Sequence, residues 1–172
     1  MIRILGIDPG SRITGFGIIE TDGRRSRYLD SGCVRVEADQ LAEKLRIIFD
    51  SIHQIVQQYE PRQMAIEKVF MHRNADSALK LGQARGAAIC AVSTCGIEVS
   101  EYTPREIKQA IVGTGAAGKE QVQHMIQSLL ALNATPQADA ADALAVALCH
   151  AHTAAGLGFM TGVQGKRRGR LV

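Results

Sequence analysis

A short apolar run near the N-terminus ends on an acid and then turns. Residues 4–7 are apolar, rich in branched side chains, and have the length of a buried strand. Asp8 closes the run. Pro9-Gly10 follows, which fixes one φ angle and then supplies a permissive backbone, so the chain must turn here. A second branched run over residues 14–19 is close enough to be its antiparallel partner. The sequence therefore predicts a hairpin whose first strand ends on a carboxylate.

Asp8 has two explanations on this stretch alone. It can cap the turn, which is common for Asp in Asp-Pro-Gly segments. It can instead belong to a site, because burying a carboxylate at a strand end costs several kcal/mol unless a cation or hydrogen-bond donors compensate. The hairpin does not decide between the two.

Downstream, the hydrophobic pattern predicts an α/β chain in which strands and helices alternate. Asp22-Gly23 is a hairpin turn signal, so the first three strands form an antiparallel meander. Residues 63–69 follow a helix and therefore lie parallel to the first strand through a right-handed crossover. The elements expected after the first hairpin are a strand over 24–36, a helix over 41–59, a strand over 63–69, a helix over 76–94, a strand over 97–102, a helix opening at Thr103-Pro104, a helix over 119–132 and a helix from Thr135 to about His152.

Glu67 is a lone acid near the end of the strand over 63–69. Parallel strands present their carboxyl ends at one edge of the sheet, and α/β sheets bind ligands at that edge. We therefore expect Asp8 and Glu67 to lie near each other. Two acids that arrive there from different parts of the chain weaken the turn-cap explanation of Asp8.

Two further acids lie in the last predicted helix, which Thr135 can cap and Pro136 can begin. Asp139 and Asp142 are three residues apart and so share one helix face. The alanines around them let that face approach another element closely. Acids near a helix N-terminus also interact favourably with the helix dipole, which is a sufficient explanation for this segment taken alone.

Lys119 opens the helix over 119–132, where the dipole disfavours a cation, so we expect it to face an anion. The glycine-rich run before it, residues 113–118, resembles a phosphate loop only superficially. No clear buried strand precedes that run, and the Lys-Ser/Thr pair of a P-loop does not follow it. A hinge ahead of the helix is the plainer interpretation.

Four carboxylates on two strand ends and one helix face would repel one another if they met. Like charges about 4 Å apart cost roughly 4 kcal/mol per pair at an effective dielectric constant of about 20. Divalent cations remove that repulsion, and oxygen-only ligands favour Mg²⁺ or Mn²⁺ over zinc. Two such ions about 3.5–4 Å apart can activate a water molecule and stabilise the leaving oxygen of a phosphodiester.

The composition excludes several classes of protein. With 172 residues, 46% of them hydrophobic, the chain has room for one globular domain. No apolar stretch approaches the about 20 residues that span a bilayer, and the N-terminus lacks a charged leader with an apolar core. We therefore expect a cytoplasmic protein without membrane contact. The four cysteines lack metal-ligand spacing and are expected to be buried in a reducing cytosol, whereas His150 and His152 are expected at the surface.

Basic residues gather at the C-terminus. The net charge is +3, and residues 166–170 hold four of the twenty Lys and Arg, which leaves sixteen against seventeen acids elsewhere. If metal ions neutralised four of those acids, the body of the chain would be basic. Charge alone does not establish nucleic-acid binding. We expect one domain over residues 1–154 and a basic, mobile tail over 155–172.

Four motifs, spread from residue 6 to about residue 150, resemble the RuvC family of bacterial Holliday-junction resolvases and occur in the family's order. The block over 74–86 is far more specific than any lone acid. The motifs are Ile-Asp-Pro-Gly-Ser-Arg-Ile-Thr-Gly, Ala-Ile-Glu-Lys-Val-Phe, Asn-Ala-Asp-Ser-Ala-Leu-Lys-Leu-Gly-Gln-Ala-Arg-Gly and Pro-Gln-Ala-Asp-Ala-Ala-Asp-Ala-Leu-Ala.

The resemblance implies a ribonuclease H-like α/β fold. Its mixed five-stranded sheet would have three antiparallel and two parallel strands, with helices on both faces. The resemblance also implies a crossover junction endodeoxyribonuclease of homologous recombination and DNA repair. Such an enzyme is a homodimer with two active sites that makes symmetric nicks in two junction strands of like polarity, and RuvA and RuvB are its implied partners.

Carried over by position, Asp8, Glu67, Asp139 and Asp142 match the family's catalytic acids, which are also its metal ligands. The resemblance implies two Mg²⁺ ions per subunit, with Mn²⁺ as a substitute, and places Asp8 centrally as the bridge between them. Attack by metal-bound water would leave a 5′-phosphate and a 3′-hydroxyl, which a ligase can seal.

The resemblance also implies residues that contact DNA. Lys108 and Lys119 match basic residues near the scissile phosphate, whose charge they would neutralise. Phe70 matches an aromatic residue that wedges against bases at the crossover, where stacking contributes about 1–3 kcal/mol per base. Only contact with the DNA backbone is assigned to three residues in a stretch where we expect the family to vary, namely Lys68, His72 and Arg73. A preference for thymine-containing cleavage sites does not follow from these residues.

Three other functions fit part of the pattern. An ATP-binding fold of the actin and sugar-kinase type also opens with strand, Asp, Gly and hairpin, but it needs a second domain, for which 172 residues leave no room. A junction-binding module without catalysis has no physical need for four converging carboxylates. A ribonuclease H-like nuclease that acts on RNA–DNA hybrids differs in its substrate, so comparing hybrid with junction cleavage tests it.

Overall fold

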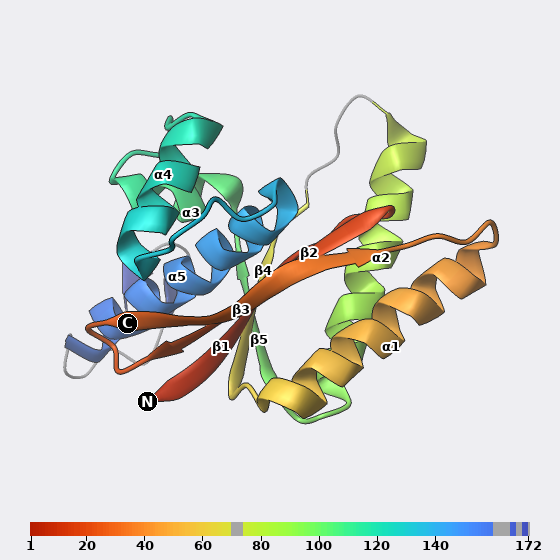
Figure 1. The fold of residues 1–172 in the computed structure, drawn as a ribbon, viewed down its shortest axis with the longest axis horizontal. Helices are drawn as coiled ribbons and strands as arrows, with labels where there is room; N and C mark the ends of the chain where they lie inside the picture. Colours follow the sequence, from red (N-terminus) through yellow and green to blue (C-terminus); the bar gives the residue numbers. More distant parts are fainter. Residues whose placement is uncertain (70–73, 160–165, 168–169, 172) are drawn as a thin grey trace.

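The computed structural model describes residues 1–69, 74–159, 166–167 and 170–171. Strands and helices follow one another as the hydrophobic pattern predicts (Figure 1). In chain order they are β1 (Ile2–Asp8), β2 (Ile13–Thr21), β3 (Ser26–Arg35), α1 (Leu41–Tyr59), β4 (Gln63–Glu67), α2 (Ala75–Ser93), β5 (Glu98–Tyr102), α3 (Pro104–Val112), α4 (Lys119–Leu130), α5 (Ala138–Phe159), β6 (Lys166–Arg167) and β7 (Arg170–Leu171).

The five-stranded sheet has the order β3-β2-β1-β4-β5. β1, β2 and β3 pair antiparallel, because tight turns join them, and Gly23 supplies the positive φ of 87° in the second turn. β4 pairs parallel with β1, and β5 pairs parallel with β4, because α1 and α2 form the crossovers. The predicted mixed sheet is confirmed.

Helices cover both faces of the sheet, with α3, α4 and α5 on one side and α1 and α2 on the other (Figure 1). Alternate residues of each strand supply the two cores. Ile4 of β1 and Ala65 of β4 pack in the core beneath α5, whereas Leu5 and Ile66 pack against α1 and α2. The even-numbered positions of β1, Asp8 included, therefore lie on the face that α5 covers.

Glycines allow α5 to lie directly on β1 and β2. Gly6 and Gly17 are opposite each other in the sheet. A Cβ atom added to Gly6 would collide with the carbonyl oxygen of Ala143, and one added to Gly17 would lie 2.7 Å from Leu144 Cδ2. The backbone of α5 consequently approaches the sheet more closely than any side chain would permit.

Some boundaries differ from the prediction. The last helix begins at Ala138 rather than Thr135, and the Thr135 hydroxyl instead accepts a hydrogen bond from Gln127 Nε2 at 2.7 Å. α5 also extends to Phe159, past residue 154. The mobility that we predicted for the basic tail stays a prediction.

Two expectations about burial were wrong. His150 is only 6% exposed, because α5 presses it against the sheet, where Nδ1 lies 2.8 Å from the Tyr102 hydroxyl and Nε2 lies 3.1 Å from Gln63 Oε1. Of the four cysteines only Cys149 is buried, and Cys90 is exposed on α2. Within the described residues, no helix is both long and apolar enough to cross a membrane.

Candidate active site

Asp8 and Glu67 end neighbouring parallel strands. Ile7 of β1 pairs with Ile66 of β4, so the next residue of each strand, Asp8 and Glu67, lies at the same sheet edge and on the face that α5 covers. The predicted approach of the two acids is confirmed. Thr14, which is fully buried, fixes the turn after Asp8, because its hydroxyl donates to the Gly10 carbonyl at 2.9 Å.

The N-terminal turns of α5 lie over this edge. Gly15 of β2 is directly opposite Asp8, and a Cβ atom on Gly15 would collide with the carbonyl oxygen of Asp139. The glycine thus brings the backbone at Asp139 down beside the strand end that carries Asp8. Asp142, three residues later, lies on the same helix face and is half-buried.

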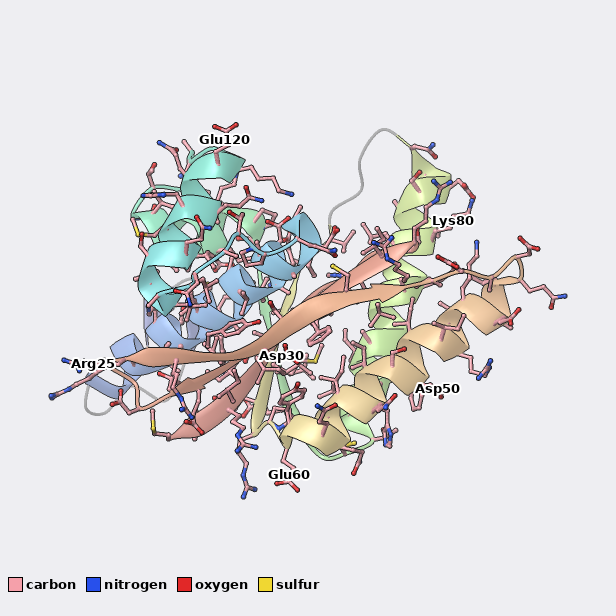
Figure 2. All side chains as sticks on the ribbon, in the orientation of Figure 1. Arg25, Asp30, Asp50, Glu60, Lys80 and Glu120 are labelled. Atoms are coloured by element: carbon pink, nitrogen blue, oxygen red, sulfur yellow. The ribbon has the colours of Figure 1, made fainter. Side chains whose placement is uncertain are left out.

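Lys119, the first residue of α4, faces an anion as predicted. Its Nζ lies 2.7 Å from Oδ2 of Asp142, and this contact raises the pKa of the lysine. Its neighbour Glu120 points away from the sheet at the outer end of α4 (Figure 2). An ammonium group therefore lies among the carboxylates although the helix dipole disfavours a cation there.

The acids share one electrostatic environment. The pKa of Asp8 is raised from its ordinary 3.8 to about 7, chiefly by burial and then by the negative charges of Glu67, Asp142 and Asp139, while Lys119 acts to lower it. Burial also raises the pKa of Glu67, as does the charge of Asp142. Asp8 is thus the acid on which the fields of the other three converge.

Lys108, on α3, also belongs to this neighbourhood, because its charge lowers the pKa of Glu67. Lys68 follows β4 directly, and its backbone N–H donates to the Tyr102 carbonyl at 2.7 Å. The remaining predicted DNA-contact residues, Phe70, His72 and Arg73, lie outside the described residues.

Cys33 and Arg85 border the site and were missed by the sequence analysis. Cys33, on β3, is paired directly with Gly15 of β2, and burial together with the charge of Asp139 raises the pKa of its thiol. Arg85, on α2, donates from Nε to the Glu67 carbonyl at 3.1 Å. The available signal for Arg85 was a cation among the small residues of a packed helix, and no signal marked Cys33.

The donor set suits a hard divalent cation, because all four acids supply carboxylate oxygen and none supplies nitrogen or sulfur. Their arrangement is not that of a closed coordination shell. Among the residues that the structure describes, no three His, Cys, Asp or Glu side chains converge closely enough to hold an ion. Lys119 is bonded to Asp142 and supplies the positive charge instead.

A family model described as "Crossover junction endodeoxyribonuclease RuvC" matches residues 4–150 of the chain. The chain belongs to the RuvC family. A RuvC of Shewanella amazonensis is 61% identical over 153 residues, which cover 89% of this chain and 88% of that protein. A RuvC of Pseudoalteromonas atlantica is 60% identical over 99% of both chains. The RuvC-family assignment makes this protein an endodeoxyribonuclease, a hydrolase.

Solved structures of RuvC proteins share the fold. Thermus thermophilus RuvC, solved in complex with a Holliday junction substrate, has a TM-score of 0.86 and 33% identity and covers 91% of this chain and 96% of its own. A second T. thermophilus RuvC structure has a TM-score of 0.82 at the same identity, covering 89% of this chain and 95% of its own. The predicted ribonuclease H-like architecture is confirmed.

Proposed function

We propose that this RuvC-family enzyme resolves Holliday junctions by paired, symmetric nicks, at a centre formed by Asp8, Glu67, Asp139 and Asp142. The observation that carries the proposal is the electrostatic convergence of the other three carboxylates on Asp8 at the sheet edge. The RuvC of T. thermophilus, which shares the fold, binds a Holliday junction substrate. The products would be a 5′-phosphate and a 3′-hydroxyl, which suit religation in recombination and repair.

The proposed cofactor is a pair of Mg²⁺ ions per subunit, for which Mn²⁺ would substitute. Bound there, the ions would supply an activated water and stabilise the leaving oxygen. Asp8 would be the shared ligand, because the other three acids act on it together. Lys119 would compete with the ions for Asp142, since its ammonium lies 2.7 Å from one oxygen of that carboxylate.

Lys119 and Lys108 would neutralise charge on the scissile phosphate. Both ammonium groups already lie within electrostatic reach of Glu67, whose pKa they lower. A phosphodiester seated at this edge would therefore meet two cations beside the acids. Phe70 and Arg73 continue the chain from β4 and would contact the bases and the DNA backbone.

A homodimer would place two such sites on one junction, one for each of the two strands cut. The surface that we propose for the second subunit is a stripe of α2 formed by three exposed residues, Leu79, Gly82 and Cys90, and the half-buried Gly86. The Leu79 side chain is 67% exposed. A Cβ atom on Gly82 or Gly86 would meet nothing within 4 Å, so neither glycine serves packing inside the described subunit. Small residues of this kind let a second helix approach closely.

RuvA and RuvB would act with the enzyme at the same junction, in the cytoplasm, where bacterial DNA lies. The basic residues that follow α5 would strengthen binding to DNA phosphates, and a gain of this kind weakens as the salt concentration rises.

Cleavage of a mobile four-way DNA junction tests this function. We expect Mg²⁺-dependent paired nicks from the wild type and junction binding without nicks from Asp8→Asn. Linear duplex DNA and an RNA–DNA hybrid are the substrate controls. Faster cleavage of the hybrid than of the junction would overturn the proposal, as would a wild type that binds junctions and leaves them intact with Mg²⁺ and Mn²⁺.

A further inference from the structure

Arg85 connects α2 to the end of β4. Its side chain is only 19% exposed, and its Nε donates a hydrogen bond to the backbone carbonyl of Glu67 at 3.1 Å. That carbonyl belongs to the last residue of the strand. The bond therefore fixes the peptide at which the chain leaves the sheet.

A second contact holds the guanidinium in place. Nη2 of Arg85 lies 2.8 Å from Oε2 of Glu101, on β5. This nitrogen is buried, and the contact is an ion pair without hydrogen-bond alignment. Glu101 pairs in the sheet with Ile66, the residue before Glu67. Arg85 thus bridges the ends of two adjacent parallel strands from the α2 side.

Different elements contact the side chain and the backbone carbonyl of Glu67. Glu67 alternates with Ile66, which packs in the core beneath α1 and α2, so the Glu67 side chain lies on the α5 face with Asp8. Arg85, on α2, contacts the backbone of the same residue through its carbonyl oxygen. Rotation of the Glu67–Lys68 peptide would redirect the carboxylate. The hydrogen bond from Arg85 to the Glu67 carbonyl opposes that rotation, together with the bond from the Lys68 N–H to the Tyr102 carbonyl.

We propose that Arg85 is a positioning residue that fixes Glu67 for its role at the metal centre. The inference rests on the proposed function, because it takes Glu67 as a ligand. Ligand side chains need to be held within about 0.5 Å of a productive geometry, which supporting hydrogen bonds achieve. Loss of such a supporting contact typically lowers metal affinity or activity by about 10-fold to 100-fold. Arg85 would support Glu67 in this way without contacting the substrate or the metal itself.

The test compares Arg85→Gln with Arg46→Gln. Arg46 is also paired with a carboxylate, Asp50, at 2.9 Å, but on the outer face of α1, where Asp50 points away from the sheet (Figure 2). The readouts are Mn²⁺ affinity by calorimetry without DNA, junction affinity without metal, and the cleavage rate as a function of Mg²⁺ concentration. Thermal unfolding and the oligomeric state are measured for every variant.

For Arg85→Gln we expect Mn²⁺ affinity to fall about 10-fold and the half-saturating Mg²⁺ concentration for cleavage to rise by the same factor. Junction affinity without metal stays at the wild-type value, since neither DNA contact nor charge at the phosphate is altered. Arg85→Lys gives an intermediate loss, because an ammonium cannot reproduce the fork that reaches both Glu67 and Glu101. Arg46→Gln matches the wild type throughout.

Wild-type Mn²⁺ affinity and Mg²⁺ dependence in Arg85→Gln would overturn the proposal, even if the variant were less stable. If Arg85→Gln does not fold, Glu101→Gln replaces it. This variant retains the bond to Glu67 but loosens the guanidinium, and we expect a several-fold loss of metal affinity, whose absence would again overturn the proposal. Failure of the wild type to cut junctions, with metal affinity still dependent on Arg85, would overturn the proposed function and leave this inference standing.

Discussion

The Nζ atom of Lys119 lies 2.7 Å from Oδ2 of Asp142, so a side-chain cation occupies the charge-balancing position among four acids. Two elements far apart in the sequence meet in this contact, the first residue of α4 and the second turn of α5. The ion pair offsets part of the repulsion that raises the pKa of Asp8. If divalent ions bound Asp142, the ammonium group of Lys119 would become available to contact the scissile phosphate.

Removing Lys119 is therefore predicted to have opposite effects on two quantities. In Lys119→Met, cleavage of the four-way junction falls about 100-fold, because a cation aimed at the reacting phosphate is lost. Mn²⁺ affinity without DNA rises, because Asp142 no longer has a competing partner. Calorimetry and single-turnover cleavage measure the two effects. A parallel loss of metal affinity and rate would contradict this account, and Arg46→Met controls for removal of a paired cation elsewhere.

Asp8→Asn is predicted to stabilise the protein without metal. The native state holds the Asp8 proton up to a pH of about 7, whereas the unfolded chain releases it near 3.8. Wild-type stability therefore falls as the pH rises through this window. At about pH 8 the substitution should recover up to about 4 kcal/mol, the equivalent of about three pKa units.

Urea unfolding in the presence of a chelator measures the effect of Asp8→Asn. Added Mg²⁺ should then stabilise the wild type more than the variant, because ligands bound only by the native state shift unfolding. Equal unfolding midpoints for the two proteins from about pH 5 to pH 8 would show that Asp8 carries no such repulsion.

His150 makes the stability depend on pH with the opposite sign to Asp8. Burial lowers its pKa, while Glu98 opposes the shift, so the native state holds the ring neutral. Nε2 donates to Gln63 Oε1, and Nδ1 accepts from the Tyr102 hydroxyl. Because the folded pKa lies below the ordinary 6.5, this contribution to stability is complete above 6.5 and is lost as the pH falls through the folded value.

The comparison for this prediction is wild type against His150→Gln. Between about pH 7 and pH 5, the wild type should lose more unfolding free energy than the variant does. Both proteins retain the active-site acids, so subtracting one pH profile of unfolding free energy from the other removes the contribution of those acids. Parallel pH profiles would indicate that His150 is protonated equally in the folded and unfolded states.

Gly15→Ala should damage both stability and activity. The added methyl group would collide with the carbonyl oxygen of Asp139 and push α5 away from Asp8. Overpacking of this kind costs about 1–3 kcal/mol. The matched control is Gly156→Ala, on α5 itself, where a Cβ atom meets nothing within 4 Å. This substitution should raise the free energy of unfolding by up to about 1 kcal/mol. Thermal unfolding and junction cleavage separate the two variants.

Periodicity made much of this architecture predictable. Asp8 and Glu67 could be placed together because strand ends and a parallel crossover require no knowledge of side-chain contacts. The anionic partner of Lys119 followed from the helix dipole, although its identity as Asp142 did not. The family resemblance supplied the roles of Asp139 and Asp142, for which the dipole alone was a sufficient explanation.

Long-range contacts could not be predicted in the same way. The bond from Arg85 to the Glu67 carbonyl depends on how α2 rotates against the sheet, which propensities do not determine. His150 looked like a surface residue because its partners, Gln63 and Tyr102, lie far away in the sequence. The packing role of Gly6 and Gly17 emerges only once α5 lies over them.

The most direct test of the four-acid centre is anomalous scattering from crystals of the protein grown with Mn²⁺. We predict two anomalous peaks at the carboxyl end of β1 and β4, with ligand oxygens about 2.1–2.2 Å away, Asp8 between them and Lys119 released from Asp142. An intact contact between Lys119 and Asp142, with no peak beside Asp8 at saturating Mn²⁺, would contradict the account.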